Sequence, residues 1–171
     1  MKNLNKEEEE EKLQHFIFSI DDRMENFVDK LSKEGYELDY SLSSLDELER
    51  YMIKEQIDNS DENLEIRTDC WIYLGEVFRI QSKKAIWEVS LNKENTANHG
   101  LYVLKGHSDK GLEFVPIRYI KAFILKKKIG LLKSVFTNHL SPLELNLDEF
   151  PTEEEPKKNK NRWNLLDDSE N

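Results

Sequence analysis

The chain has almost no cysteine, little glycine and little proline. Cys70 is the single cysteine among 171 residues, so an intrachain disulfide and a multi-cysteine zinc site are both excluded. Cys70 lies within an apolar helical pattern, and we interpret it as a small buried hydrophobic residue rather than a reactive thiol. The fold must therefore be stabilised by its apolar core.

Long apolar runs are also missing. The most apolar stretch, Val115 to Leu132, is interrupted by Arg118, Lys121 and a lysine triplet. It therefore lacks the ~18 uninterrupted apolar residues of a membrane helix. Five consecutive glutamates stand near the N-terminus, where a signal peptide has its apolar region. We therefore expect a cytoplasmic protein. The abundance of Lys, Asn, Glu and Ile is typical of an AT-rich bacterial genome.

Sequence signatures of common catalytic and ligand sites do not occur. The chain has no phosphate-binding glycine loop, no dinucleotide-binding glycine turn and no His-Glu-x-x-His helix. His99 and His107 flank a predicted strand and could approach each other, but we interpret them as solvated loop residues rather than metal ligands. No serine or cysteine has a base at a suggestive spacing. We therefore expect no catalytic residue, metal or cofactor.

Charge is distributed unevenly along the chain. The net charge is −10, and residues 1–12 and 144–171 together hold 14 of the 35 acidic residues but only 7 of the 25 basic ones. We expect residues 1–10 and 144–171 to be mostly disordered, because like charges repel each other and bury little apolar surface. A single domain should then cover residues 11–143, which is long enough for one core.

Apolar spacing predicts four helices in this domain. Apolar residues recur at intervals of three and four, as on one face of an amphipathic helix. The predicted helices cover residues 11–34, 43–56, 63–83 and 116–139. Gly35 is a natural stop for the first helix, and Gly130 is a candidate break within the last one.

Three short segments have the composition and alternation of strands. Tyr36 to Tyr40 alternates apolar and acidic residues, and the other two segments are rich in β-branched and aromatic residues. The predicted strands cover residues 36–40, 85–91 and 100–106. The fold class that we predict is α+β, with helices packed on a small antiparallel sheet.

A glycine in the middle of the third predicted helix is the most informative feature. Glycine inside a helix costs on the order of 1 kcal/mol relative to alanine, so we expect another element to pack closely on Gly75. Tyr73 and Glu76 are three residues apart and share a helix face. They are either a binding or general-acid pair, or a structural group in which a buried Glu76 accepts hydrogen bonds from a neighbouring strand or loop. We prefer the structural interpretation, because a lone carboxylate rarely makes an active site.

The order of several short motifs resembles a loose group of small bacterial proteins, most of them uncharacterised. The motifs are Asp39-Tyr40-Ser41, Ser44-Leu45-Asp46-Glu47-Leu48, Tyr73-Leu74-Gly75-Glu76-Val77, Trp87 and Val115-Pro116-Ile117. In that group a strand leads into a leucine-rich helix, followed by a Tyr-Leu-Gly-Glu helix and a strand with tryptophan. Some related proteins lie in toxin–immunity neighbourhoods. The resemblance covers residues 36–138; it implies an α+β domain but no catalytic residue.

Two classes of function fit these observations. The first is a non-enzymatic cytoplasmic protein that binds a basic protein, such as an immunity or accessory factor. Its candidate binding residues are the linker acids Asp58, Asp61 and Glu62, while the tail acids Glu153, Glu154 and Glu155 would raise encounter rates. The alternative is a small-molecule-binding protein or an enzyme with a pocket near Tyr73, Glu76 and Trp87.

A basic stretch complicates the choice of partner. Six bases and no acid lie between Val115 and Pro142, which would suit an anionic partner or the chain's own acidic tail. The acidic pI of about 5.0 argues against nucleic acid. A basic protein therefore remains the expected partner.

Overall fold

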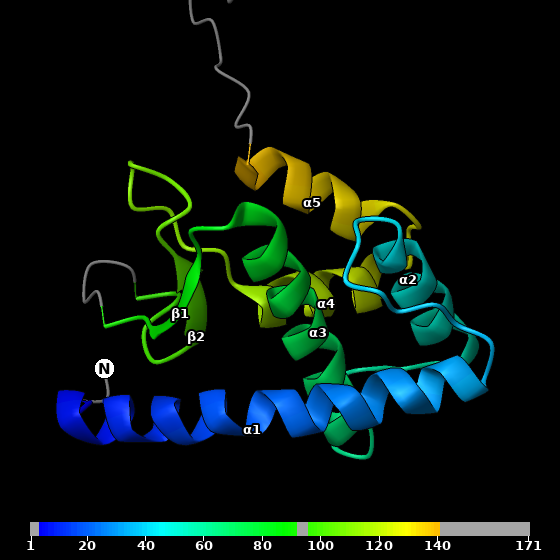
Figure 1. Cartoon of the computed structure of the whole chain (residues 1–171), viewed down its shortest axis with the longest axis horizontal. Helices are drawn as coiled ribbons and strands as arrows, with labels where there is room; N and C mark the ends of the chain where they lie inside the picture. The colour runs from blue at the N-terminus through cyan, green and yellow to red at the C-terminus, as the bar shows by residue number, and fades with distance from the viewer. Residues whose placement is uncertain (1–3, 92–95, 141–171) are drawn as a thin grey trace, which may run out of the picture.

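The computed structural model describes residues 4–91 and 96–140, which form five helices and one two-stranded sheet that lies at one end of the helical part (Figure 1). In chain order the elements are α1 Lys6–Lys33, α2 Ser44–Lys54, α3 Leu64–Ser82, β1 Ile86–Val89, β2 Tyr102–Lys105, α4 Pro116–Lys126 and α5 Leu131–Leu140. The predicted α+β class, with helices packed on a small antiparallel sheet, is confirmed.

The long helix α1 begins five residues earlier than predicted. The Asn5 side chain caps the helix by accepting the Glu7 N–H at 3.2 Å, and three glutamates in the first turn face the positive end of the helix dipole. A Lys6–Glu10 ion pair spans the same turn. Residues 6–10, which we expected to be disordered, are therefore helical. Capping and the dipole outweigh the repulsion among the glutamates.

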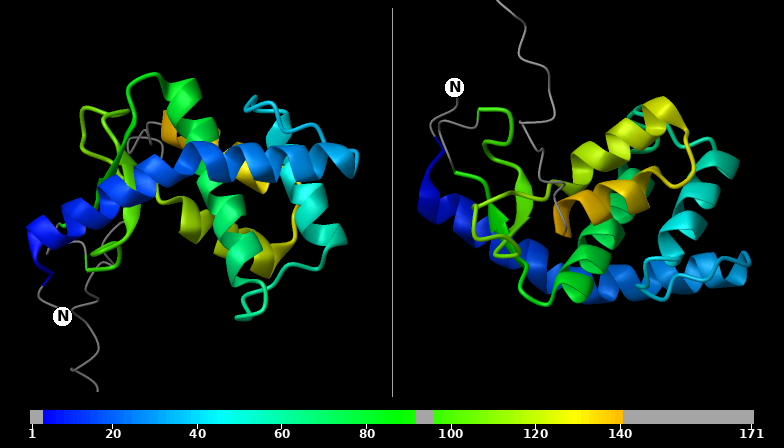
Figure 2. Two further views of the ribbon diagram at one scale, coloured as in Figure 1. Left: turned by 60° about the horizontal axis from the view of Figure 1, so that its bottom comes forward. Right: turned by 90° about the horizontal axis from the view of Figure 1, so that it is seen from above.

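Helix α3 is the central element. It crosses α1, and α4 and α5 pack on its other side (Figure 2). All of its residues from Ile72 to Phe78 are buried, and Cys70 is fully buried as predicted. Burial raises the pKa of the Cys70 thiol. The core residues of α3 are Cys70, Ile72, Tyr73, Leu74, Val77 and Phe78.

The predicted strand 36–40 is wrong. This segment is irregular, and Tyr40 has a left-handed backbone with φ of 61°. Its N–H donates to the Tyr73 hydroxyl at 3.0 Å instead of to a neighbouring strand. The alternation of apolar residues reflects burial of Leu38 and partial burial of Tyr36 and Tyr40 against the helices, without a sheet ladder.

The described sheet is a single antiparallel pair. Ile86 lies opposite Lys105 and Val89 lies opposite Tyr102, inside the predicted ranges 85–91 and 100–106. An isolated bridge between Leu104 and Phe114 extends the pairing by one residue. Strand β1 of this sheet packs against α1.

Gly130 breaks the last predicted helix, 116–139, into α4 and α5. Lys127 and Gly130 both have positive φ, which ends one helix before the next begins. The buried Glu49 of α2 accepts the N–H groups of Gly130 and Leu132, at 2.5 and 2.7 Å, and so caps the start of α5. Burial nevertheless raises the pKa of Glu49. A carboxylate 81 residues away in sequence therefore fixes the break.

Candidate functional site

Gly75 makes room for the indole of Trp87. A Cβ atom on Gly75 would lie closer than 3.0 Å to two ring carbons of Trp87, and 3.2 Å from Cγ of Pro116. Real Cβ atoms essentially never approach that closely. The expected close packing on Gly75 is therefore present, and the packing elements are β1 and the first residue of α4.

Glu76 is a buried carboxylate whose partners come from β1 and from its own helix. Its side chain accepts the Trp87 indole N–H at 2.7 Å. The Arg79 guanidinium donates to both carboxylate oxygens, at 3.0, 3.0 and 2.6 Å. The hydrogen bond to Glu76 raises the pKa of Arg79 further. This is the arrangement of the preferred structural interpretation, in which a strand donates to Glu76.

A groove opens beside this cluster, between α1 and β1. Its volume is about 370 Å³, and Glu76, Arg79 and Trp87 line one side of it. The α1 side chains Ile17, Ile20 and Asp21 also line it. The groove therefore combines apolar surface with a bound carboxylate and a half-exposed guanidinium, and it contains two of the three residues predicted for a ligand pocket.

Tyr73, the third residue, does not line this groove. It is fully buried, and its hydroxyl donates to Ser44 Oγ at 2.6 Å while accepting the Tyr40 N–H at 3.0 Å. Burial raises the pKa of Tyr73 to about 12. Tyr73 therefore joins α3 to α2, whereas Glu76 joins α3 to β1. Three residues along a helix are enough to direct the two side chains to different partners.

The predicted linker acids have different roles. The Asp58 carboxylate accepts the Ser60 N–H at 2.9 Å and the Asn63 amide at 2.8 Å. Hydrogen bonds from the Ser60 side chain, the Asn63 side chain and the Ser60 backbone lower the pKa of Asp58 to about 2. Asp58 thus organises the loop before α3. Asp61 and Glu62 are exposed at the surface. The tail acids Glu153, Glu154 and Glu155 lie outside the described residues.

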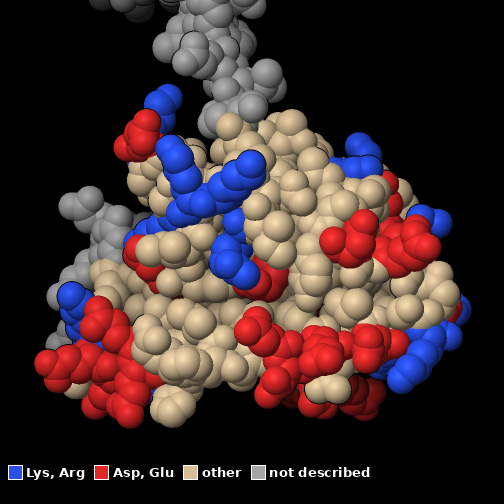
Figure 3. Space-filling model, in the orientation of Figure 1, with Lys and Arg blue, Asp and Glu red and all other residues tan. Residues whose placement is uncertain are grey.

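The outer face of α1 is an acidic surface that the sequence analysis missed. Phe18 is 79% exposed on this helix, although it is a large aromatic residue. Exposed acids accompany it on α1; they are Glu11, Asp21, Asp22, Glu25 and Asp29. Figure 3 shows acidic side chains gathered along the edge of the molecule where α1 lies. The sequence held the signal, because Phe18 falls outside the apolar stripe of Leu13, Ile20 and Met24.

A histidine pair also escaped the sequence analysis, and the interpretation of His107 as a solvated loop residue is wrong, because both of its ring nitrogens are buried. His107 lies beside His139 of α5, with ring centroids 5.6 Å apart, and the Tyr119 hydroxyl is 2.5 Å from Nε2 of His139. Burial lowers the pKa of both histidines. The buried ring atoms His107 Nδ1, His107 Nε2 and His139 Nδ1 have no hydrogen-bond partner among the described residues. Sequence spacing could not reveal this pair, since 32 residues separate the two positions.

Comparisons with known proteins give no relative. No family model, curated protein or solved structure matches the chain. The resemblance to small bacterial proteins therefore stays a prediction. In residues 4–91 and 96–140, no helix is long and apolar enough to cross a bilayer, and no group of three or more His, Cys, Asp or Glu side chains is placed to hold a metal.

Proposed function

We propose that this chain is a non-enzymatic cytoplasmic protein that binds a basic protein through the acidic face of α1, defined by Phe18, Asp21, Asp22, Glu25 and Asp29. The exposure of Phe18 carries the proposal. Burying a large aromatic side chain contributes strongly to an interface, and binding hot spots are enriched in aromatic residues. The proposed role of Phe18 is to be the apolar centre of such an interface.

The charges around Phe18 support a basic partner. Asp21 and Asp22 lie three and four residues after Phe18, on adjacent positions of the same helix face, and Glu25 lies one turn further. Arg23, the base within this stretch, instead pairs with Asp69 of α3. The face therefore keeps an excess of negative charge, which speeds encounter with a basic surface and rejects an acidic one.

The linker acids can extend this interface. Arg23 Nη2 donates to the Glu65 carbonyl at 3.2 Å, which ties the first turn of α3 to the middle of α1. Asp61 and Glu62 lie immediately before that turn. We propose that a partner bound at Phe18 also contacts these two acids, whereas Asp58 serves the loop itself.

Photocrosslinking tests the proposal directly. A benzoylphenylalanine at position 18 should crosslink a basic protein in the organism of origin, and the same group at position 125 should not. Leu125 is a matched control, because it is 78% exposed but lies on the lysine-rich α4 side. Capture of the same proteins from both positions, or of none at position 18, would contradict the proposal.

The immunity or accessory role is a narrower proposal. It predicts that the gene for the crosslinked protein lies beside the gene for this chain, and that co-expression of this chain relieves that protein's toxicity. A crosslinked partner that is neither toxic nor encoded nearby would leave protein binding intact and remove the immunity role.

The groove at Glu76, Arg79 and Trp87 supports a second candidate function, the binding of a small molecule. Its volume of about 370 Å³ suits a small polar ligand that pairs with Arg79, whose side chain is 44% exposed. Mass spectrometry of the protein purified under non-denaturing conditions tests this function. A retained molecule that Arg79→Gln releases would favour the groove over the acidic face.

A further inference from the structure

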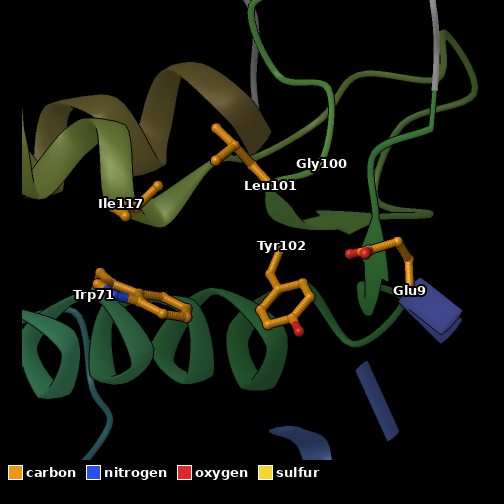
Figure 4. A pocket seen from close by; sticks show the side chains of 6 residues that line it. All are labelled: Glu9, Trp71, Gly100, Leu101, Tyr102 and Ile117. Atoms are coloured by element: carbon orange, nitrogen blue, oxygen red, sulfur yellow. The ribbon is translucent and has the colours of Figure 1, made fainter. Parts of the chain in front are cut away.

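A smaller cavity lies near the N-terminal end of α1, and its lining residues are all different from those of the groove. Its volume is about 180 Å³. We call it the aromatic slot, and it is lined by Glu9, Trp71, Gly100, Leu101, Tyr102 and Ile117 (Figure 4). Figure 4 shows the rings of Trp71 and Tyr102 side by side, with the Glu9 carboxylate pointing from α1 toward Tyr102. All six residues are partly exposed, so the slot opens to solvent.

The aromatic walls are held in place from behind. The Phe16 ring stacks on Tyr102 with centroids 4.6 Å apart and on Trp71 with centroids 5.4 Å apart. Trp71 also meets Trp87 edge to face at 6.0 Å. Because these contacts fix both rings, a ligand would not have to order them on binding.

Glu9 gives the slot a negative group with little exposure. Its side chain is only 13% exposed, and it accepts a hydrogen bond from the Lys12 ammonium at 2.6 Å. The Lys12 side chain is 59% exposed, and Lys12 does not line the slot. Glu9 is therefore already paired with an alkylammonium, but with one that can move into solvent at little cost.

We propose that the aromatic slot binds the alkylammonium end of a lysine side chain presented by the basic partner. Aromatic faces attract ammonium groups, and the Glu9 carboxylate supplies the opposite charge. Leu101 and Ile117 supply apolar surface for the methylene stem. The incoming ammonium displaces Lys12 from Glu9. This inference rests on the proposed function, because the lysine belongs to the basic partner. Glu9 lies about two and a half helical turns before Phe18, on the opposite face of α1, so the partner must extend round the N-terminal end of the helix to reach the slot.

The slot can be tested without the partner. The probes are N-acetyl-lysine amide and N-acetyl-norleucine amide, which share the stem but differ in the ammonium. Titration of the full-length, ¹⁵N-labelled protein is followed by NMR, with the Trp71 indole N–H as reporter. The lysine probe should shift Trp71 saturably and bind about tenfold more tightly than norleucine.

Three variants sharpen the test. Glu9→Gln should weaken the lysine probe about fivefold, the upper range for a partly exposed charge pair, while Glu8→Gln on the exposed side should change little. Lys12→Met should tighten the probe about twofold to fivefold, because it removes the competing ammonium. A merely structural Glu9–Lys12 pair would not give opposite effects at its two members.

Several results would overturn the proposal that the aromatic slot binds a lysine side chain. These are equal binding of both probes, no saturable shift at Trp71, or weaker binding by Lys12→Met in a protein whose amide spectrum stays folded. Failure of the slot is distinguishable from failure of the proposed function. Crosslinking at position 18 without lysine binding would reject only the proposal that the slot binds lysine. Lysine binding without a crosslinked partner would reject the α1 interface, and with it the proposal that the lysine comes from the partner.

Discussion

Trp87 lies over Gly75 and donates its indole N–H to Glu76, so one side chain of β1 contacts two consecutive residues of α3. The glycine supplies space and the carboxylate supplies the acceptor. This relationship fixes β1 on the central helix, and it places the groove on one side of the indole.

Gly75→Ala should destabilise the protein, although alanine is the better helix former. The new Cβ would overlap the Trp87 ring, and overpacking of this kind costs about 1–3 kcal/mol against a gain of about 1 kcal/mol in helix propensity. Gly75→Leu should be worse. Urea unfolding measures both effects, and Trp87→Phe in the alanine background should recover part of the loss. An unchanged free energy of unfolding for Gly75→Leu would refute the packing argument.

Glu76→Ala should cost about 2 kcal/mol in the free energy of unfolding, because it leaves the buried Trp87 indole N–H without an acceptor. The loss of the ion pair with the half-exposed Arg79 adds little to this cost, since water can solvate the guanidinium. Glu76→Gln keeps an acceptor and should cost less than Glu76→Ala. Thermal unfolding of the two variants, with exposed Glu62→Gln as control, checks the order. Equal losses for Ala and Gln would show that the hydrogen bond is unimportant.

Acidification should destabilise the fold through His107 and His139. Burial lowers the pKa of both in the folded state, so the unfolded chain binds more protons as the pH falls. Their stabilising contribution is therefore complete above the unfolded pKa of about 6.5 and is lost as the pH drops below it. His107→Phe should flatten the dependence of the unfolding free energy on pH between about 7.5 and about 5.5, a window centred on the unfolded pKa of histidine. An identical slope for His107→Phe would remove the histidine pair as its source.

Removal of residues 146–171 should leave the folded domain intact. Their acidic composition, with two prolines, cannot bury enough apolar surface to offset the entropy of ordering. Limited proteolysis should yield a stable fragment that ends near residue 143. Because α1 begins at Lys6, the fragment should begin before Lys6 and not at residue 11. A truncated chain that unfolds at a clearly lower temperature would place an essential contact in the removed segment.

Binding of the basic partner should weaken as salt rises, because exposed charges are screened beyond ~8 Å at physiological ionic strength. The double substitution Asp21→Lys and Asp22→Lys should increase the dissociation constant more than Asp61→Lys with Glu62→Lys. Deletion of the tail acids Glu153, Glu154 and Glu155 should mainly slow association. Surface plasmon resonance at two salt concentrations separates these effects, and a salt-independent affinity would exclude an electrostatic interface.

Local features of the fold could be predicted from the sequence because they depend on neighbouring residues. The apolar stripe gave α1 its extent beyond residue 11, and Gly130 marked the break before α5. The start of α1 was missed because its glutamate run suggested repulsion, whereas Asn5 and the helix dipole favour the helix. Gly75 predicted close packing, since glycine is costly in a helix without such a reason.

Pairings between distant residues could not be predicted in this way. Tyr36 to Tyr40 alternates like a strand, but a strand also needs a partner, and only the fold shows that the Tyr40 N–H meets Tyr73. The spacing of Tyr73 and Glu76 placed them on one face, yet their partners lie on α2 and β1. His107 and His139 come together through the packing of α5.

The sequence by itself determined the helices, the buried cysteine, the close packing at Gly75 and the excess of acid, because composition and periodicity act within a few residues. The tertiary structure alone decided that Trp87 is the residue over Gly75, that Glu49 caps α5, and that Trp71, Tyr102 and Glu9 share one slot. Each of these contacts joins segments whose approach depends on how the whole core packs. Local propensity contains no information about which distant side chain fills a given space.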